Sequence, residues 1–235
     1  MDVFSTFIKF SYCPIIINVY RIHLAEENIV WERIAFTYGI TFISFAIGIA
    51  AIYVLSDASK KERKKQIDYV ITILIHFVLY IWLSKILLRI QVVFNDPIAV
   101  IAFPSDSRSF YLAHIWIAVH QWFKRQALPT LFIPIILASS FVYEFIQVVF
   151  FEQHYKFYYV IMLGVLLIGF LLLKYKCDLS HLVKIISFVW TSGIFLFSTM
   201  YPLFTIYGFI IDSTYAGALL IVTVIWMFRK KEYIG

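Results

Sequence analysis

Residues 157–173 read FYYVIMLGVLLIGFLLL, a run of seventeen positions without a charged side chain. A helix needs about 20 residues of this kind to cross the roughly 30 Å hydrocarbon core of a bilayer. Similar apolar runs precede and follow this one along the chain at short intervals. The sequence therefore predicts an all-α integral membrane protein with several transmembrane helices.

The composition of the whole chain excludes a water-soluble fold. Apolar residues make up 62% of the 235 residues and charged residues 14%, whereas soluble domains contain about 45–50% and 25%. A mean hydropathy of +0.86 leaves too little polar surface to cover a soluble particle. The two cysteines, Cys13 and Cys177, lie far apart and are expected on opposite sides of the membrane, so neither a disulfide framework nor a metal cluster is predicted. Although the net charge is +6, the basic residues sit at helix ends, so membrane topology explains them and no nucleic-acid partner is expected.

Seven apolar runs have the length expected of membrane spans, and they cover about residues 34–55, 67–93, 109–123, 129–151, 157–173, 185–203 and 206–228. The N-terminal segment, residues 1–33, contains an apolar stretch interrupted by Lys9 and Pro14, which favours an interfacial or re-entrant helix. We therefore expect one polytopic transmembrane domain over residues 34–228, followed by a basic tail at 229–235.

The basic residues are distributed unevenly between alternate loops. Four loops hold thirteen of the twenty, namely Lys60, Lys61, Arg63, Lys64, Lys65, Lys124, Arg125, Lys174, Lys176, Lys184, Arg229, Lys230 and Lys231. The loops between them carry only Arg108 and Lys156. By the positive-inside rule, the basic loops and the C-terminus face the cytoplasm. The segments 95–108 and 152–156 are then expected on the extracytoplasmic face, where the candidate site would lie.

Four ionisable side chains near the outer ends of the second and third predicted spans form a candidate anion site: Lys85, Arg89, Asp106 and Arg108. Charged groups are costly in hydrocarbon and need a partner or a function. Lys85 and Arg89 are four residues apart and share one helix face, where two cations repel each other unless an anion lies beside them. One hypothesis is that they bind a lipid phosphate, which suits the donor fork of arginine. The alternative is that they extend to the headgroups or pair with Asp96 or Asp106.

Glu144 and Gln147 form a predicted polar node inside the fourth span. Glu144 is interpreted as a proton relay, as the partner of a buried cation, or as a hydrogen-bonding node between helices, and the last is favoured. The spacing Glu144-x-x-Gln147 also resembles that of VanZ-like membrane proteins, whose downstream Arg, Asp and Asn this chain lacks.

Two histidines in neighbouring spans, His76 and His120, are candidate axial ligands of a haem b, because paired histidines at matching depth hold haem in membrane cytochromes. Polar contacts between helices are the favoured role for these rings. No His/Cys spacing typical of a metal site occurs, so no metal ligand is predicted, and haem is the one cofactor alternative.

The segment Phe103-Pro104-Ser105-Asp106-Ser107 resembles the second motif of the PAP2 family, the type 2 phosphatidic acid and isoprenoid-diphosphate phosphatases. In the bacterial undecaprenyl-diphosphate branch of that family the motif reads Phe-Pro-Ser-Asp-His. The order of elements is similar over roughly residues 80–170. Arg89-x6-Asp96-Pro97 stands where the family has Lys-x6-Arg-Pro, and Gln147-Val148-x5-His154 stands where it has Ser-Arg-x5-His-x3-Asp. The resemblance implies an outward-facing phosphate site with His154 as nucleophile or hydrogen-bond partner.

The chain departs from the family pattern at four of six functional positions. Asp96 and Val148 replace arginines, Ser107 replaces the acid histidine, and Tyr158 replaces the aspartate that orients the nucleophile. Phosphoryl transfer through a phosphohistidine needs cations around the transferred group and a positioned acid. These departures argue against catalysis by the family mechanism.

Scarce glycine (8 residues), abundant aromatics (20%) and short loops leave little room for a catalytic cavity. They favour a non-catalytic accessory or scaffold subunit that contacts the bilayer and protein partners in the membrane. The first alternative is an outward-facing lipid-phosphate binding protein, which as an enzyme would be a lipid (isoprenoid) phosphate phosphatase. The second alternative is a haem or quinone membrane anchor.

Overall fold

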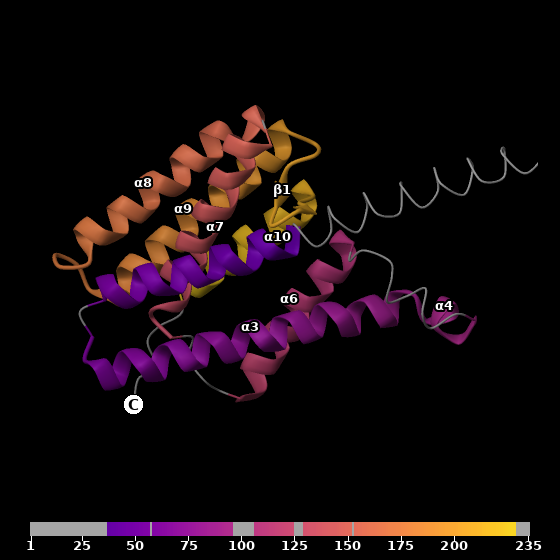
Figure 1. Ribbon diagram of the computed structural model, residues 1–235, viewed down its shortest axis with the longest axis horizontal. Helices are drawn as coiled ribbons and strands as arrows, with labels where there is room; N and C mark the ends of the chain where they lie inside the picture. Colours follow the sequence, from indigo (N-terminus) through magenta and orange to yellow (C-terminus); the bar gives the residue numbers. More distant parts are fainter. Residues whose placement is uncertain (1–36, 57, 96–105, 125–128, 152, 229–235) are drawn as a thin grey trace, which may run out of the picture. The chain divides into compact units, whose positions relative to one another are not determined.

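The computed structural model describes residues 37–56, 58–95, 106–124, 129–151 and 153–228 (Figure 1). The chain divides into two compact units, Met1–Ile40 and Thr41–Gly235. The predicted N-terminal interfacial helix and the basic tail at 229–235 lie outside the described residues. The contacts below all belong to the second unit.

Helices make up most of the described chain, as predicted. A first helix covers Thr37–Leu55. It is followed by α3 (Lys60–Leu88), α4 (Ile90–Asn95), α6 (Ser107–Lys124), α7 (Phe132–Phe150), the 3-10 helix η1 (His154–Lys156), α8 (Phe157–Leu173), α9 (Leu179–Met200), β1 (Thr205–Ile206), β2 (Phe209–Ile210) and α10 (Ser213–Phe228).

Five of the described helices are long and apolar enough to cross a membrane: Thr37–Leu55, Lys60–Leu88, Phe132–Phe150, His154–Leu173 and Leu179–Met200. These five correspond to five of the seven predicted spans. The other two predicted spans, at 109–123 and 206–228, are also helical over most of their length. However, α6 carries several polar side chains and α10 has only 16 residues. Length and composition thus support five spans.

The helix boundaries differ most from those expected in three of the predicted spans, one of which is the sixth, expected from residue 185 although α9 begins at Leu179. The second span was expected over 67–93, but α3 starts at Lys60, where Ser59 caps it, and ends at Leu88 because Arg89 leaves the helical conformation (φ −121°, ψ 31°). The last span was expected from residue 206, but α10 begins only at Ser213. Residues 205–210 instead form an antiparallel β-hairpin, which the all-α prediction did not include.

The turn of this β-hairpin consists of Tyr207 and Gly208, whose φ angles are 51° and 83°. Positive φ at both central residues is the requirement of a type I′ turn, whose twist matches that of the paired strands. Glycine adopts this conformation readily, but a bulky aromatic residue rarely does. The conformation of Tyr207 must therefore be held by contacts with the rest of the unit.

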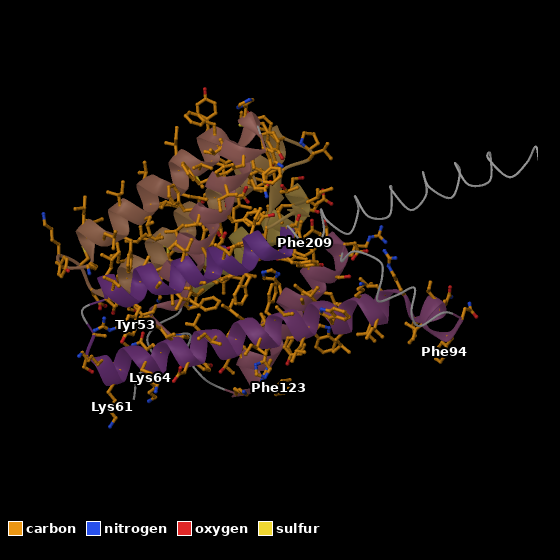
Figure 2. All side chains as sticks on the ribbon, viewed as in Figure 1. Tyr53, Lys61, Lys64, Phe94, Phe123 and Phe209 are labelled. Atoms are coloured by element: carbon orange, nitrogen blue, oxygen red, sulfur yellow. The ribbon has the colours of Figure 1, made fainter. Side chains whose placement is uncertain are left out.

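Helices α7, α8, α9 and α10 share one hydrophobic core with the β-hairpin, which includes Leu163 of α8, Trp190 of α9 and Phe204. A second core cluster joins Thr37–Leu55 to α3 and α7 through residues such as Ile52, Val70 and Ile135. Many large apolar side chains point outward from the helices, as Phe94 and Phe123 do in Figure 2. Buried polar contacts and an apolar exterior are the arrangement expected of helices in lipid.

Basic side chains bind backbone carbonyl groups at one end of the helices. Arg63 donates to the carbonyl oxygens of Tyr53 and Ala58, and Lys174 donates to that of Leu55. These cations therefore satisfy carbonyl groups at and just beyond the end of the first helix, where the helix dipole favours positive charge. Lys61 and Lys64 extend from the start of α3 at this end (Figure 2).

The β-hairpin lies at the opposite end of the helices. There the Tyr111 hydroxyl of α6 donates to the Ile210 carbonyl (2.7 Å) and accepts from the backbone N–H of Asp212 (2.9 Å). The rings of Phe110 and Phe209 stack with centroids 4.5 Å apart. These contacts tie the start of α6 to the β-hairpin.

Candidate functional site

A buried ion pair joins α7 to the start of α8. Lys156 Nζ donates to Glu144 Oε2 at 2.6 Å, and each side chain is only 1% exposed. Glu144 lies on the inward face of α7, and the short helix η1 turns the chain so that Lys156 points back toward it. Charges removed from water need a partner of this kind. Of the interpretations of Glu144, the partner of a buried cation matches this geometry.

The predicted polar node extends from this pair into the turn between α7 and α8. Gln147, also buried, accepts a hydrogen bond from Gln153 Nε2 at 3.1 Å. The Tyr155 hydroxyl donates to Gln153 Oε1 at 3.3 Å. Glu144 and Gln147 therefore both bind residues just after α7, and together they fix the direction in which α8 leaves the turn.

The β-hairpin inserts the Tyr207 side chain beside this node. Its ring stacks on Phe45 (5.2 Å between centroids, 11° between planes) and lies 5.1 Å from the Tyr143 ring. Its hydroxyl accepts from Ser140 (3.0 Å) and lies 2.7 Å from the Ser139 hydroxyl, which itself donates to the Ile136 carbonyl. The Tyr207 hydroxyl also lies 3.4 Å from the Ile136 carbonyl, to which it can donate, so either hydroxyl can be the donor in the contact between Tyr207 and Ser139.

Burial raises the pKa of the Tyr207 phenol above its usual range, and the hydrogen bonds with Ser139 and Ser140 offset only part of that effect. The nearby charge of Glu144 raises the same pKa further. The phenol therefore stays neutral under ordinary conditions.

The structure brings together three of the four residues of the predicted anion site. Lys85, Arg89 and Asp106 interact electrostatically. Lys85 is buried with its ammonium 5.3 Å from the centre of the Trp82 ring. The fourth residue, Arg108, is exposed in the first turn of α6. The Asp106 carboxylate therefore lies within electrostatic range of Lys85 and Arg89.

Asp106 also caps α6. Its Oδ1 accepts hydrogen bonds from the backbone N–H (2.9 Å) and the hydroxyl of Ser109, the usual role of a helix N-cap residue. Burial alone would raise the pKa of the Asp106 carboxyl, but the hydrogen bonds from Ser109 and the charge of Arg89 hold that pKa below its usual range.

His154, the proposed nucleophile, makes no contact with Lys85, Arg89 or Asp106 among the described residues. Its side chain is exposed on η1 and makes no hydrogen bond or ion pair within the ranges that the structure describes. The PAP2-like segments around Asp96-Pro97 and Phe103–Ser105 are outside those ranges. A site that His154 shares with Lys85, Arg89 and Asp106 therefore stays a prediction.

The rings of His76 and His120 touch edge to face, with centroids 4.9 Å apart and planes at 71°. His120 Nδ1 is hydrogen-bonded to the Tyr80 hydroxyl (2.8 Å) and His76 Nδ1 to the Thr72 carbonyl (2.6 Å). Two axial histidines bind an iron from opposite faces of a porphyrin, which must fit between them. The contact between the rings leaves no room for a porphyrin between them in this arrangement, and haem ligation by His76 and His120 stays a prediction.

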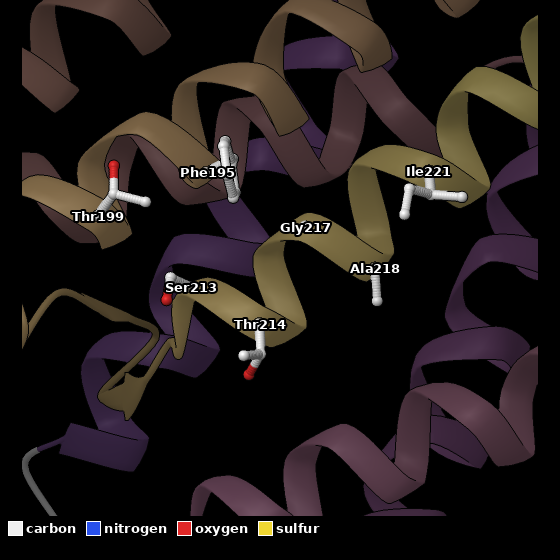
Figure 3. Close-up of a pocket in the computed structure, with 7 residues that line it drawn as sticks. All are labelled: Phe195, Thr199, Ser213, Thr214, Gly217, Ala218 and Ile221. Atoms are coloured by element: carbon white, nitrogen blue, oxygen red, sulfur yellow. The ribbon is translucent and has the colours of Figure 1, made fainter.

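Two shallow hollows on the helix surfaces are apolar. One, of about 350 Å³, lies between α7 and α8 beside Gly164. The other, of about 500 Å³, lies between α9 and α10 (Figure 3). It is lined mainly by small side chains of α10, with Phe195 and Thr199 on α9 and Ser213, Thr214, Gly217, Ala218 and Ile221 on α10.

Sequence reasoning missed Lys156 and Tyr207 as members of the polar node. Lys156 is the one Lys or Arg between Arg125 and Lys174, and it follows Glu144 by twelve residues. Its position as an isolated cation near Glu144 could have indicated an ion pair, but Lys156 was assigned to a loop. Nothing in the local sequence marks Tyr207, because its contacts come from distant helices.

Comparisons with known protein families, curated proteins and solved structures found no match to this chain. The similarity to the PAP2 family therefore rests on the quoted motif residues alone.

Proposed function

We propose that this chain is a non-catalytic accessory or scaffold subunit of a membrane assembly. One observation carries the proposal: the charged and amide side chains of the polar node between α7 and η1 bind one another, whereas the described hollows are apolar. Glu144 and Lys156 neutralise each other out of contact with water, and Gln147 is bound by Gln153. Substrate sites usually place a few polar groups in a concave pocket, and the two hollows lack that arrangement.

The proposal includes seven membrane spans, with α6 and α10 as the two additional ones. At about 1.5 Å per residue, the 18 residues of α6 extend about 27 Å and the 16 residues of α10 about 24 Å, close to the thickness of a bilayer core. Polar groups of α6 find partners on α3, as in the pair Tyr69–Gln121 at 2.8 Å. The end with Arg63 and Lys174 would face the cytoplasm and the β-hairpin the other side, as the positive-inside rule requires.

The hollow between α9 and α10 is the contact that we assign to a partner. Ser213 and Gly217 are four residues apart on α10, as are Thr214 and Ala218. Small residues at this spacing allow a second transmembrane helix to approach closely, where van der Waals contacts hold it. The proposed occupant is therefore one transmembrane helix of another subunit.

Copurification in a mild detergent tests this proposal. We expect the native chain to elute with a partner, and Gly217→Leu to lose that partner because leucine fills the hollow next to Phe195. The matched control is Gly169→Leu on α8, where a Cβ atom meets nothing within 4 Å, and it should keep the partner. A native chain that purifies as a single monodisperse monomer would overturn the proposal.

A second candidate, a lipid-phosphate binding protein, is favoured by the cluster of Lys85, Arg89 and Asp106 with Arg108 close by in sequence. Phosphate release from an isoprenoid diphosphate by the purified protein tests its catalytic form. That form requires turnover that His154→Ala abolishes. If the purified protein releases no phosphate, the catalytic form of this candidate function is excluded.

A further inference from the structure

The tip of the β-hairpin covers the Glu144–Lys156 ion pair. The backbone N–H of Tyr207 lies within hydrogen-bonding reach of the Glu144 carboxylate, and the Tyr207 phenol lies within electrostatic range of it. The phenol reaches past it to the serine pair of α7, Ser139 and Ser140. Glu144, Lys156 and Tyr207 thus form one contact between α7, η1 and the β-hairpin.

The tip is held in a conformation that Tyr207 would not adopt by itself. A left-handed φ of 51° in an aromatic residue is strained and persists only where surrounding contacts impose it. Those contacts are the two serine hydroxyls and the stacked ring of Phe45. Loss of contacts beneath the tip therefore favours its release.

Glu144 has one oxygen available to a ligand. Oε2 binds Lys156, whereas Oε1 is buried and accepts no hydrogen bond of ordinary geometry within the described residues, although the Tyr207 backbone N–H lies within reach of the carboxylate. A buried carboxylate oxygen without a donor is a costly arrangement. It is also the atom at which a carboxylate accepts a proton.

We propose that Glu144 is a proton-binding site and that its occupancy releases the β-hairpin. A proton from water binds Oε1, and the carboxylate becomes a neutral carboxylic acid. Lys156 keeps its own proton and remains an ammonium ion. The attraction at 2.6 Å is then lost, and Lys156 is left as an unpaired cation with 1% of its side chain exposed.

An unpaired buried ammonium is unstable and is relieved by hydration. Lys156 belongs to η1, whose neighbouring residue His154 is already exposed. Water therefore reaches Lys156 when η1 and the adjoining β-hairpin tip move outward. The opened site exposes Glu144 and the serine pair of α7.

The other titratable groups facing Glu144 are phenols: Tyr143 of α7, Tyr155 of η1, Tyr159 of α8 and Tyr207 of the β-hairpin. Phenols are neutral at and below neutral pH. Within the described residues, Lys156 is then the charged group that faces Glu144, so protonation of Glu144 controls the balance of charge at this site. This inference does not depend on the scaffold role.

Thiol labelling of Ser140→Cys in a Cys13→Ser background tests the inference. Ser140 is 1% exposed beneath Tyr207, whereas the native Cys177 is exposed and serves as an internal standard for the pH dependence of the reaction. As the pH is lowered, we expect the Ser140→Cys thiol to label roughly tenfold faster relative to Cys177, because labelling follows the population of the open form. A ratio that does not change with pH overturns the inference.

Two variants and one control separate release of the β-hairpin from general unfolding. Glu144→Gln mimics the protonated state and should label fast at every pH, while Glu144→Leu combined with Lys156→Met leaves no buried charge and should label slowly at every pH. Ser187→Cys, buried in α9, should stay unlabelled throughout. A parallel rise at Ser187→Cys, or slow labelling in Glu144→Gln, overturns the inference. If Glu144→Gln does not fold, the inference is tested by the pH dependence of Ser140→Cys labelling in the chain that keeps its native ion pair.

Discussion

Replacement of Lys156 by Met would leave the Glu144 carboxylate buried without its counter-ion. At 2.6 Å the two charges attract each other by about 6 kcal/mol at an effective dielectric constant of about 20, and the desolvation of both groups offsets much of this. Removal of one partner strands the other, so we expect Lys156→Met to lower the free energy of unfolding by about 3–5 kcal/mol. Replacement of both residues, as Glu144→Leu with Lys156→Met, leaves no stranded charge and should be neutral or stabilising by about 1–4 kcal/mol.

Equilibrium unfolding in mixed micelles, followed by tryptophan fluorescence, measures these differences. Lys176→Met is the matched control, because Lys176 is exposed and its replacement should change stability by less than about 0.5 kcal/mol. The reasoning fails if Lys156→Met costs less than about 1 kcal/mol, the value of a solvent-exposed pair. It also fails if the double variant is as unstable as Lys156→Met alone.

Three other predictions concern single side chains. Tyr207→Phe removes the hydroxyl that binds the serine pair of α7 and should cost about 1–3 kcal/mol, whereas Tyr158→Phe, exposed on α8, should leave thermal unfolding unchanged. Gly48→Ala places a Cβ atom 2.8 Å from a backbone nitrogen of α7 and should lower the melting temperature, while Gly169→Ala, with open space around it, should not. Asp106→Asn keeps a capping oxygen but removes the negative charge at the start of α6, and should destabilise the protein by about 0.3–1 kcal/mol at neutral pH. Because the pKa of Asp106 is lowered in the folded state, its contribution is complete above the unfolded pKa of about 3.9 and declines as the pH falls through the folded value. The difference between Asp106→Asn and the native chain, followed by unfolding at a series of pH values, should therefore disappear in acid; a difference that persists there contradicts the assignment.

Helix positions could be predicted because long apolar runs have few alternatives in a chain of this composition. The run at 157–173 matches α8 at both ends. The β-hairpin could not be found in this way, because two-residue strands show no periodicity and Thr205–Ile210 is as apolar as a helix. The end of α3 was missed because residues 90–94 are nearly as apolar as those before them, while the break depends on the backbone conformation of Arg89.

The candidate site was only partly predictable. Glu144 could be identified because a carboxylate within an apolar helix needs an explanation. Its partner was not identified, because the positive-inside analysis treats every basic residue between spans as part of a loop. The 3-10 turn of η1 brings Lys156 back into the protein, and no pattern in the sequence predicts that turn. Motif spacing also grouped His154 with Arg89, and that grouping stays a prediction because spacing alone does not show which helices are neighbours.

The separation of Glu144 and Lys156 by twelve residues also bears on membrane insertion during synthesis. A single charged residue at the centre of an inserting helix raises its insertion free energy by about 2.5–3.5 kcal/mol. Here Lys156, at the start of the next helix, neutralises Glu144. The helices α7 and α8 can therefore leave the translocon together as a pair with no net charge at this site. Neutralisation at this step needs no contribution from α9, α10 or the β-hairpin, which are synthesised later. We therefore expect α7 and α8 to insert as one unit before the ion pair joins them in the finished protein.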